Sequence, residues 1–203
     1  MNNVTALTFG LQAFVTLLVI LDPPGATPLF LSLTGSQKRR EQIRMAWLAA
    51  MTSLGIITIF ALFGQLIVGY LDISIPALQG AGGLLLLLIS LDLLKGADHR
   101  NDSKEKKNLA LVPLGTPLLA GPGAIVTIML FAKKVDGTSM GLALALAVLG
   151  AHLVIGISLT FATRIVGVIK ESGVMLLAKI AGLLTAAIAF EMLITGIQEM
   201  IAS

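Results

Sequence analysis

The chain contains no cysteine and few charged or aromatic residues. Of its 203 residues, 12% are charged and 5% are aromatic, whereas 56% are hydrophobic. The lack of cysteine excludes disulfide bonds, iron–sulfur clusters and thiolate metal sites. Soluble domains carry roughly 25% charged residues, so the scarcity of charge, with a mean hydropathy of +0.96, indicates an integral membrane protein. This length has room for about six spans of ~20–25 residues with short loops.

Signatures of enzymes and of nucleic-acid-binding proteins are also missing. The sequence has no Cys/His cluster and no P-loop. Its net charge of +3 is small, and its Lys and Arg residues lie in loops, which does not favour a nucleic-acid partner. We therefore expect no enzyme activity, no cofactor and no metal site. Residues 1–4 contain no basic residue, so we expect the first apolar run to be a retained span rather than a cleaved signal peptide.

Six apolar segments are long enough to predict membrane spans. We expect the spans at about 5–33, 45–71, 77–94, 109–132, 140–163 and 174–201, with a loop at 164–173. The stretch 95–108 is the one strongly hydrophilic region. The predicted organisation is therefore a three-span unit over 1–98, a cytoplasmic polar linker over 99–108 and a second three-span unit over 109–203.

Basic residues alternate between the two ends of these spans. The second and fourth loops hold only Lys133 and Lys134. The other loops hold Lys38, Arg39, Arg40, Arg44, Lys95, Arg100, Lys104, Lys106, Lys107, Arg164 and Lys170. The positive-inside rule places these basic loops in the cytoplasm and both termini outside it.

Two landmarks recur at nearly the same separation. Pro24-Gly25-Ala26 returns 98 residues later as Pro122-Gly123-Ala124, and the segment 83–94 resembles the segment 182–193, 99 residues later. This spacing indicates duplication of a three-span unit, whose second copy is inverted because each unit has an odd number of spans. The alternative is chance, since the second similarity is short and rich in Leu. The predicted fold is thus all-α, with two inverted three-helix repeats.

Proline and glycine predict that the first and fourth spans are discontinuous. Pro24 lacks a backbone donor, and Pro23 disfavours helical geometry at Asp22. After each break a new half-helix begins, and its free N–H groups suit a carboxylate. The unpaired carbonyls before each break suit an ammonium group, so the two breaks together suit an amino acid. The alternative is a plain proline kink.

These breaks supply the candidate substrate-binding residues. They are Asp22, Pro23, Pro24, Gly25, Ala26, Thr116, Pro117, Gly121, Pro122, Gly123 and Ala124. Asp22 is a candidate ligand for a cation, an ammonium group or a proton. The alternative is an N-cap that accepts from N–H groups near Ala26, and both roles can hold at once.

Asp22, Glu191 and His152 are the candidate coupling residues, because an ionisable group inside a span is costly and points to function. For His152 the alternative is a hydrogen bond to a neighbouring helix, and Asp92 is expected to be a solvated helix-end charge.

The sequence resembles the MarC family of six-span membrane proteins. The resemblance rests on the segments Asp22–Phe30 and Val112–Ile125 and covers essentially the whole chain. It implies an inner (plasma) membrane secondary transporter for small neutral amino acids such as glycine, alanine and serine, coupled to protons. Lys179 and Glu191 stand where the family often has Arg and Gln, so ion coupling here can differ from that of relatives.

Three other functions compete with this interpretation. An exporter of other small metabolites or drugs would share the fold, a passive channel would show conductance without counterflow, and a non-transporting scaffold would leave the paired breaks without a role. The low aromatic content favours a small substrate over a bulky lipophilic one.

Overall fold

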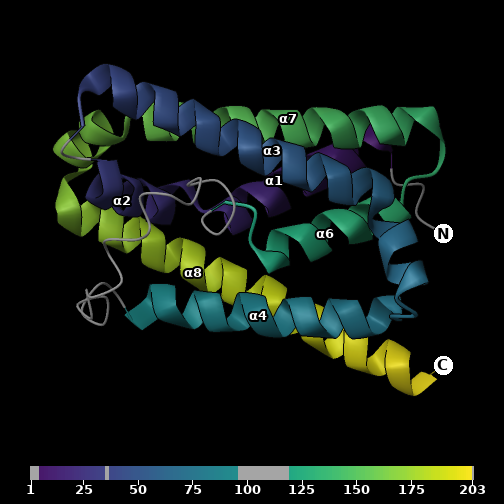
Figure 1. Cartoon of the computed structure of the whole chain (residues 1–203). Coiled ribbons are helices and arrows are strands. Elements are labelled where there is room, and N and C mark those ends of the chain that lie inside the picture. The colour runs from purple at the N-terminus through teal and green to yellow at the C-terminus, as the bar shows by residue number, and fades with distance from the viewer. Residues whose placement is uncertain (1–4, 35–36, 96–118, 203) are drawn as a thin grey trace.

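The computed structural model describes residues 5–34, 37–95 and 119–202, apart from the side chains of residues 28, 29, 32, 33, 92, 93, 95, 122, 169, 171, 174 and 178 (Figure 1). Its elements are all helices. They are α1 (Ala6–Leu21), α2 (Pro23–Thr34), α3 (Arg39–Tyr70), α4 (Ile75–Lys95), α6 (Pro122–Lys133), α7 (Gly137–Thr160) and α8 (Ala162–Ala202). The all-α prediction is confirmed for this part of the chain.

Four helical segments are long and apolar enough to cross a membrane, within the described residues. They are Ala6–Thr27, Arg39–Tyr70, Gly137–Thr160 and Met175–Ala202, and the apolar helices Ile75–Leu91 and Gly123–Lys133 are shorter. The residues that would complete the fourth predicted span, and the predicted linker 99–108, lie outside the described residues. The prediction of a multi-pass membrane protein therefore holds, and the count of six spans stays a prediction.

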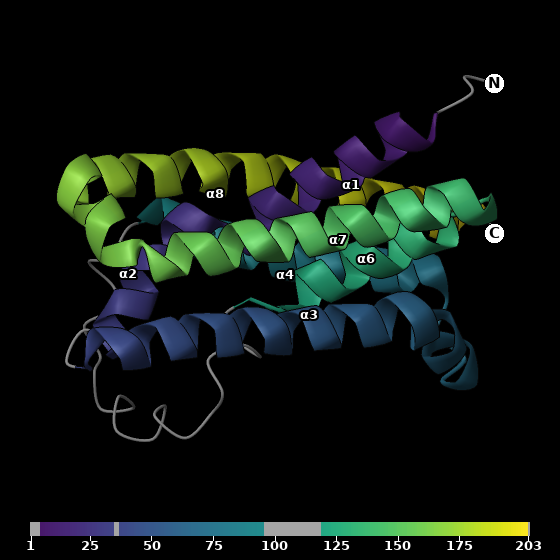
Figure 2. The ribbon, with the colours of Figure 1, turned by 90° about the horizontal axis from the view of Figure 1, so that it is seen from above.

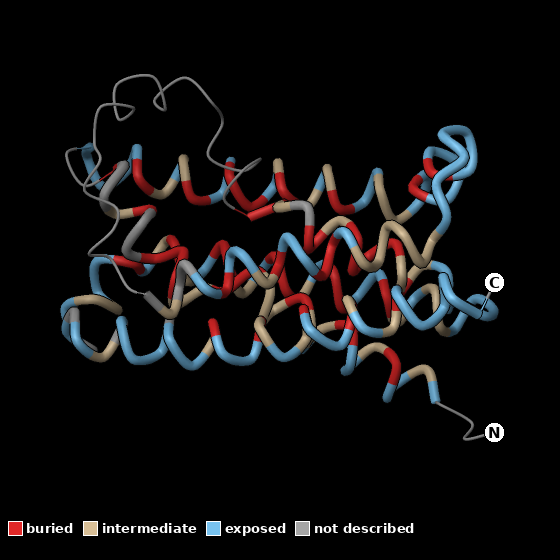
Figure 3. The backbone as a smooth tube through the Cα atoms, turned by 90° about the horizontal axis from the view of Figure 1, so that it is seen from below, coloured by how far each residue is buried: buried red, intermediate tan, exposed pale blue. Residues whose placement is uncertain are grey.

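The helices form three layers that run lengthwise through the molecule. In Figure 1, α3 and α7 form the upper layer, α4 and α8 the lower one, and α1, α2 and α6 lie between them. The two members of each outer pair pack together and run in opposite directions. Seen from above, α1 begins and α8 ends at the same end of the molecule (Figure 2). The broken helices therefore lie in the interior, as Figure 3 shows by the concentration of buried backbone there.

Small residues set how closely these layers approach. A Cβ added at Gly83 of α4 would lie 2.7 Å from the carbonyl oxygen of Ala189, and one added at Gly196 of α8 would lie 2.7 Å from the carbonyl oxygen of Pro76. These two glycines therefore let the backbones of α4 and α8 touch. Because apolar lipid offers little hydrophobic drive for helices to associate, such close van der Waals packing stabilises the pair.

The predicted loop at 164–173 does connect two apolar helical segments, Gly137–Thr160 and Met175–Ala202, but it is not irregular chain. The chain is helical through this stretch and is interrupted only at Lys170, whose φ of 62° and ψ of 163° are not helical. The prediction took charge as the sign of a loop, but a charged residue is compatible with a helix at the membrane surface. Helix α3 likewise begins at Arg39, inside the polar stretch that was expected to precede it.

Candidate functional site

The first span is broken at Asp22, as predicted. Asp22 has φ 44° and ψ 67°, in the left-handed region, and its N–H donates to the carbonyl of Leu18 at the end of α1. Its carboxylate Oδ1 accepts from the N–H of Gly25 at 3.1 Å, and its own carbonyl accepts from the N–H of Ala26 at 2.8 Å. Asp22 is only 7% exposed. It therefore ends one helix and starts the next within the protein interior.

The structure thus confirms the N-cap role of Asp22. The N–H groups of Gly25 and Ala26 were predicted to be free for a substrate carboxylate, but both donate to Asp22. Because the aspartate places a negative charge at the N-terminus of α2, this end of the break suits a cationic group better than a second carboxylate. A direct contact of Asp22 with substrate stays a prediction.

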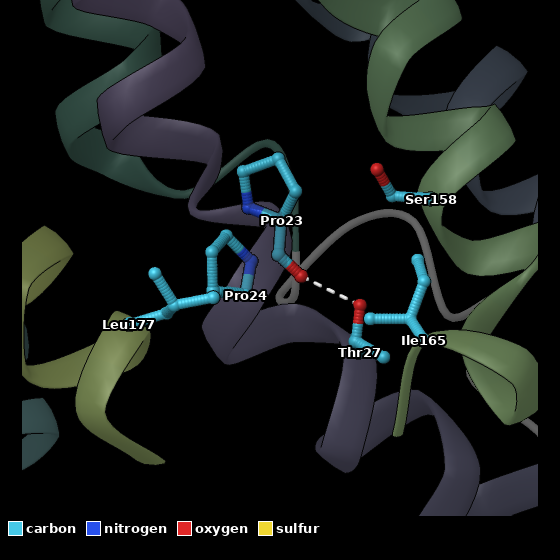
Figure 4. Close-up of a pocket in the computed structure, with 6 residues that line it drawn as sticks. All are labelled: Pro23, Pro24, Thr27, Ser158, Ile165 and Leu177. Carbon is cyan, nitrogen blue, oxygen red and sulfur yellow. Dashed lines mark hydrogen bonds between the residues drawn. The ribbon is translucent and has the colours of Figure 1, made fainter. Parts of the chain in front are cut away.

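A cavity lies beside this break. Its volume is about 100 Å³, and it is lined by Pro23, Pro24, Thr27, Ser158, Ile165 and Leu177. Figure 4 shows that its walls come from α2, from the end of α7 and from two separate parts of α8. The Thr27 hydroxyl donates to the carbonyl of Pro23 at 2.7 Å. Hydroxyl groups of Thr27 and Ser158 are thus the polar side-chain groups of an otherwise apolar wall.

The start of α6, where the second break was predicted, is built differently. Gly121 is the N-cap of α6 and supplies no side-chain cap, and Pro122 follows at the first helical position. The carbonyl of Gly121 accepts from the N–H of Ile125 at 3.2 Å. The N-terminus of α6 therefore lacks the carboxylate that Asp22 gives to α2. Thr116 and Pro117, and the side chain of Pro122, lie outside the described residues.

Gly123 has a packing role in this arrangement. A Cβ at Gly123 would collide with the side chain of Leu86 on α4, and one at Gly82 of α4 would lie 2.8 Å from Val126 of α6. These contacts draw α6 against α4. Ala26 from the first break and Ala124 from the second belong to one buried cluster, so the two breaks share a core.

None of the three candidate coupling residues lines the cavity, although Asp22 directly precedes Pro23, which does. His152 is 3% exposed, and its Nδ1 lies 2.8 Å from the carbonyl of Val148. Because a carbonyl only accepts, Nδ1 carries the proton, and Nε2 accepts from the hydroxyl of Ser53 at 3.1 Å. The interhelical hydrogen bond considered for His152 is therefore confirmed. Glu191 is exposed on α8, and the side chain of Asp92 lies outside the described residues.

Four cavity residues were not among the predicted site residues: Thr27, which directly follows the predicted stretch 22–26, and Ser158, Ile165 and Leu177. Ser158 could have been noticed as a small polar residue in the apolar run of α7. Ile165 and Leu177 carry no signal, because they are apolar residues among others and only the fold of α8 brings them to Pro23.

Comparison with known proteins agrees with this architecture. The model of the MarC family of integral membrane proteins matches residues 7–201. The chain belongs to the MarC family. It is 36% identical to a UPF0056 membrane protein of Methanocaldococcus jannaschii over 199 residues, which cover 95% of this chain and 97% of the relative.

Bacterial relatives are similar over almost the same length. A UPF0056 membrane protein of Aquifex aeolicus is 31% identical over 94% of this chain and 92% of its own length. The UPF0056 membrane protein YhcE of Escherichia coli is 29% identical over 91% of this chain and 90% of its own. No solved structure matches. These MarC relatives carry no substrate in their names.

Proposed function

We propose that this MarC protein is a secondary transporter of small neutral amino acids, of the glycine, alanine and serine type, working by alternating access with protons as the coupling ion. The observation that carries the proposal is the cavity of about 100 Å³ at the break of the first span. Drug-sized ligands occupy pockets of roughly 300–1,000 Å³, and an apolar cavity of about 150 Å³ holds benzene. A ligand of five or six non-hydrogen atoms therefore suits this volume, as in glycine or alanine.

The two breaks are complementary in charge. Asp22 is buried and directly precedes Pro23, which lines the cavity, and a carboxylate at this break would favour an ammonium group. Helix α6 begins at an uncharged Gly121 cap, and its partial positive end favours a carboxylate. Because both breaks contribute to one buried cluster, a small zwitterion between them would meet both charges. Asp22 is also our proposed proton carrier.

Helix packing supports the inverted repeat that alternating access requires. If the second copy begins 98 or 99 residues after the first, α2 corresponds to α6, α3 to α7 and α4 to α8. Helix α2 packs on α7 and α8, and its counterpart α6 packs on α3 and α4. These contacts of α2 and α6 thus correspond to each other under the exchange of the two copies.

The Ser53–His152 hydrogen bond supports the same symmetry. The two residues are 99 residues apart in the sequence, which makes them equivalent positions in the two copies. Equivalent positions related by a two-fold axis can touch only where that axis passes. The axis of the proposed repeat therefore runs through the α3–α7 contact, and the two copies would rock about it.

Basic residues support an orientation with both termini outside the cytoplasm. Lys38, Arg39 and Arg164 lie at the junctions before α3 and after α7, at the end of the molecule opposite to the start of α1. The positive-inside rule assigns this basic end to the cytoplasm. The proposed location is the inner (plasma) membrane.

An intramembrane enzyme is not favoured. The Gly137–Gly141 run has the Gly-x-Ser-x-Gly pattern, but it follows a helix rather than the strand of a nucleophile elbow.

Uptake by purified protein in proteoliposomes tests the function. Labelled glycine and alanine should accumulate when a pH gradient is imposed, and counterflow should occur without one. The variant Ser158→Leu, which fills the cavity, should abolish uptake, whereas Ser139→Leu, the same change at the exposed start of α7, should not. No uptake by the unaltered protein in either condition would reject the carrier. Conductance in planar bilayers without counterflow would indicate a channel instead.

A further inference from the structure

Arginine is concentrated at the end of the molecule where α3 begins and α7 ends (Figure 1). Arg40 and Arg44 are exposed on the first two turns of α3, and Arg164 is exposed shortly after the end of α7. The guanidinium Nη1 of Arg39 donates to the hydroxyl of Thr163 at 3.4 Å, so the start of α8 lies beside the first turn of α3. Cationic side chains from the two halves of the chain therefore lie near one another at this end.

The protein does not neutralise these cations. Among the described residues, Arg40, Arg44 and Arg164 form no ion pair. The guanidinium of Arg164 lies 5.6 Å from the centre of the Phe161 ring, a contact that leaves its charge uncompensated. Glu41 is the single acidic residue between positions 38 and 44, where four residues are basic. This end of the molecule therefore has positive charge available for an anionic partner.

The arginines of α3 continue into an apolar stripe. Four exposed residues share one side of α3: Arg40, Arg44, Trp47 and Met51. Their spacing of three or four residues per step matches the helical period. With a rise of 1.5 Å per residue, Trp47 lies roughly 5–10 Å along the helix axis from the two arginines. The stripe thus changes from cationic to apolar over a distance comparable to that between the phosphate and the acyl chains of a phospholipid.

Trp47 lies at the seam between α3 and α7, which pack side by side (Figure 2). A Cβ added at Gly156 of α7 would lie 3.1 Å from the Cζ3 atom of Trp47, so the indole ring rests against the backbone of α7. Gly156 is buried, whereas Trp47 keeps 39% of its surface exposed. Tryptophan is enriched at the membrane–water interface, which agrees with a ring placed just below a group of arginines.

We propose that this face binds an anionic phospholipid. We call it the basic seam, and it consists of Arg40, Arg44 and Trp47 of α3, Gly156 of α7 and Arg164 of α8. The lipid phosphate accepts from the arginines, whose planar forks match two phosphate oxygens, and an acyl chain runs past Trp47. Basic pockets between membrane helices suit such head groups. A zwitterionic phospholipid carries its own cation beside the phosphate and binds less well.

The fluorescence of Trp47 tests the proposal, because Trp47 is the single tryptophan of the chain. The full chain is reconstituted in phosphatidylcholine vesicles in which a fixed fraction of the lipid is brominated phosphatidylglycerol or brominated phosphatidylcholine. Bromine quenches a tryptophan that it approaches, so the anionic lipid should quench more strongly. Arg40→Gln and Arg44→Gln should each lower its affinity relative to phosphatidylcholine about fivefold, the effect of one basic residue at an anionic surface.

The matched control is the double variant Lys133→Gln with Lys134→Gln. It removes two exposed cations at the end of α6, at the opposite end of the molecule, and should leave the quenching unchanged. Equal quenching of the unaltered protein by the two brominated lipids would overturn the site. A loss in the control as large as in the arginine variants would indicate only a general attraction to positive charge and would also overturn it. Quenching by both lipids that weakens as protein density rises would place a second copy of the chain on this face instead.

Thermal unfolding in detergent is a second measurement that does not depend on tryptophan. Phosphatidylglycerol at about a hundred times its Kd should raise the melting midpoint by roughly 5–11 °C, and the double variant Arg40→Gln with Arg44→Gln should lose this shift. Phosphatidylcholine should give no such shift. An equal shift with phosphatidylcholine, or with inorganic phosphate alone, would overturn the assignment to an anionic lipid. Neither measurement requires transport, so their outcome is independent of the proposed function.

Discussion

Replacing Asp22 separates its structural role from its chemical one. The Asp22→Ala variant removes the carboxylate that accepts from the Gly25 N–H at 3.1 Å, and loss of such a cap costs about 1 kcal/mol. It also places alanine at φ 44°, where alanine lacks the short polar side chain that lets Asp and Asn adopt this geometry, at a cost of roughly 1–2 kcal/mol. The expected loss in the free energy of unfolding is therefore about 2–3 kcal/mol.

Two further substitutions at the same position separate the loss of the cap from the cost of the left-handed geometry. Asn tolerates left-handed geometry, and its side-chain oxygen can still accept from Gly25, so Asp22→Asn should keep nearly the full stability. Asp22→Gly loses the cap but fits φ 44°, and glycine at an N-cap costs only about a few tenths of a kcal/mol. The expected order of stability is Asn, then Gly, then Ala. Asp72→Ala is a control for the left-handed cost alone, because Asp72 has φ 53° in an exposed turn.

Thermal unfolding in one detergent, followed by circular dichroism, measures this order. For a chain of this size each kcal/mol corresponds to roughly 2–4 °C, so Asp22→Ala should lower the midpoint by roughly 4–12 °C relative to Asp22→Asn. A midpoint for Asp22→Ala within a degree of Asp22→Asn would refute both the cap and the backbone argument. If the charge carries protons, Asp22→Asn should keep counterflow in proteoliposomes but lose accumulation driven by a pH gradient.

Three other substitutions probe the packing of α4 on α8, the hydrogen bond of His152 and the backbone at Lys170. Gly83→Val should separate the backbones of α4 and α8 and cost about 1–3 kcal/mol, whereas Gly55→Val, which meets nothing within 4 Å among the described residues, should cost less; equal melting points would contradict the close contact. Ser53→Ala should remove the partner of His152 Nε2 and cost about 0.6–1.7 kcal/mol in the same assay, and no loss would contradict that bond. Lys170→Gly should relieve a backbone strain of about 1–3 kcal/mol and raise the melting point, whereas a lowered one would contradict the φ of 62°.

The break of the first span could be predicted from sequence because its causes are local. Pro23 and Pro24 restrict the backbone on their N-terminal side whatever surrounds them, and an aspartate before them is a common cap. The same reasoning failed at Lys170. There the helix is interrupted at a residue that is neither Gly nor Pro, and no local preference marks the position.

Glu191 and His152 show a second limit of the sequence. Both are ionisable residues in apolar runs, which made both candidates for ion coupling. The burial of His152 and its bond to Ser53, and the exposure of Glu191, depend on which face of each helix meets a neighbour. A residue's position along an apolar helix does not specify that face when nearly all its positions are apolar.

The sequence by itself determined that this is a helical membrane protein of the MarC type, with a break after Asp22, because hydropathy and proline geometry act over a few residues. Only the tertiary structure decided that Asp22 caps α2, that Gly123 serves packing against Leu86, and that Ser158, Ile165 and Leu177 surround Pro23. The last of these outcomes joins segments more than a hundred residues apart in the chain. The cavity exists because packed helices bring such segments together.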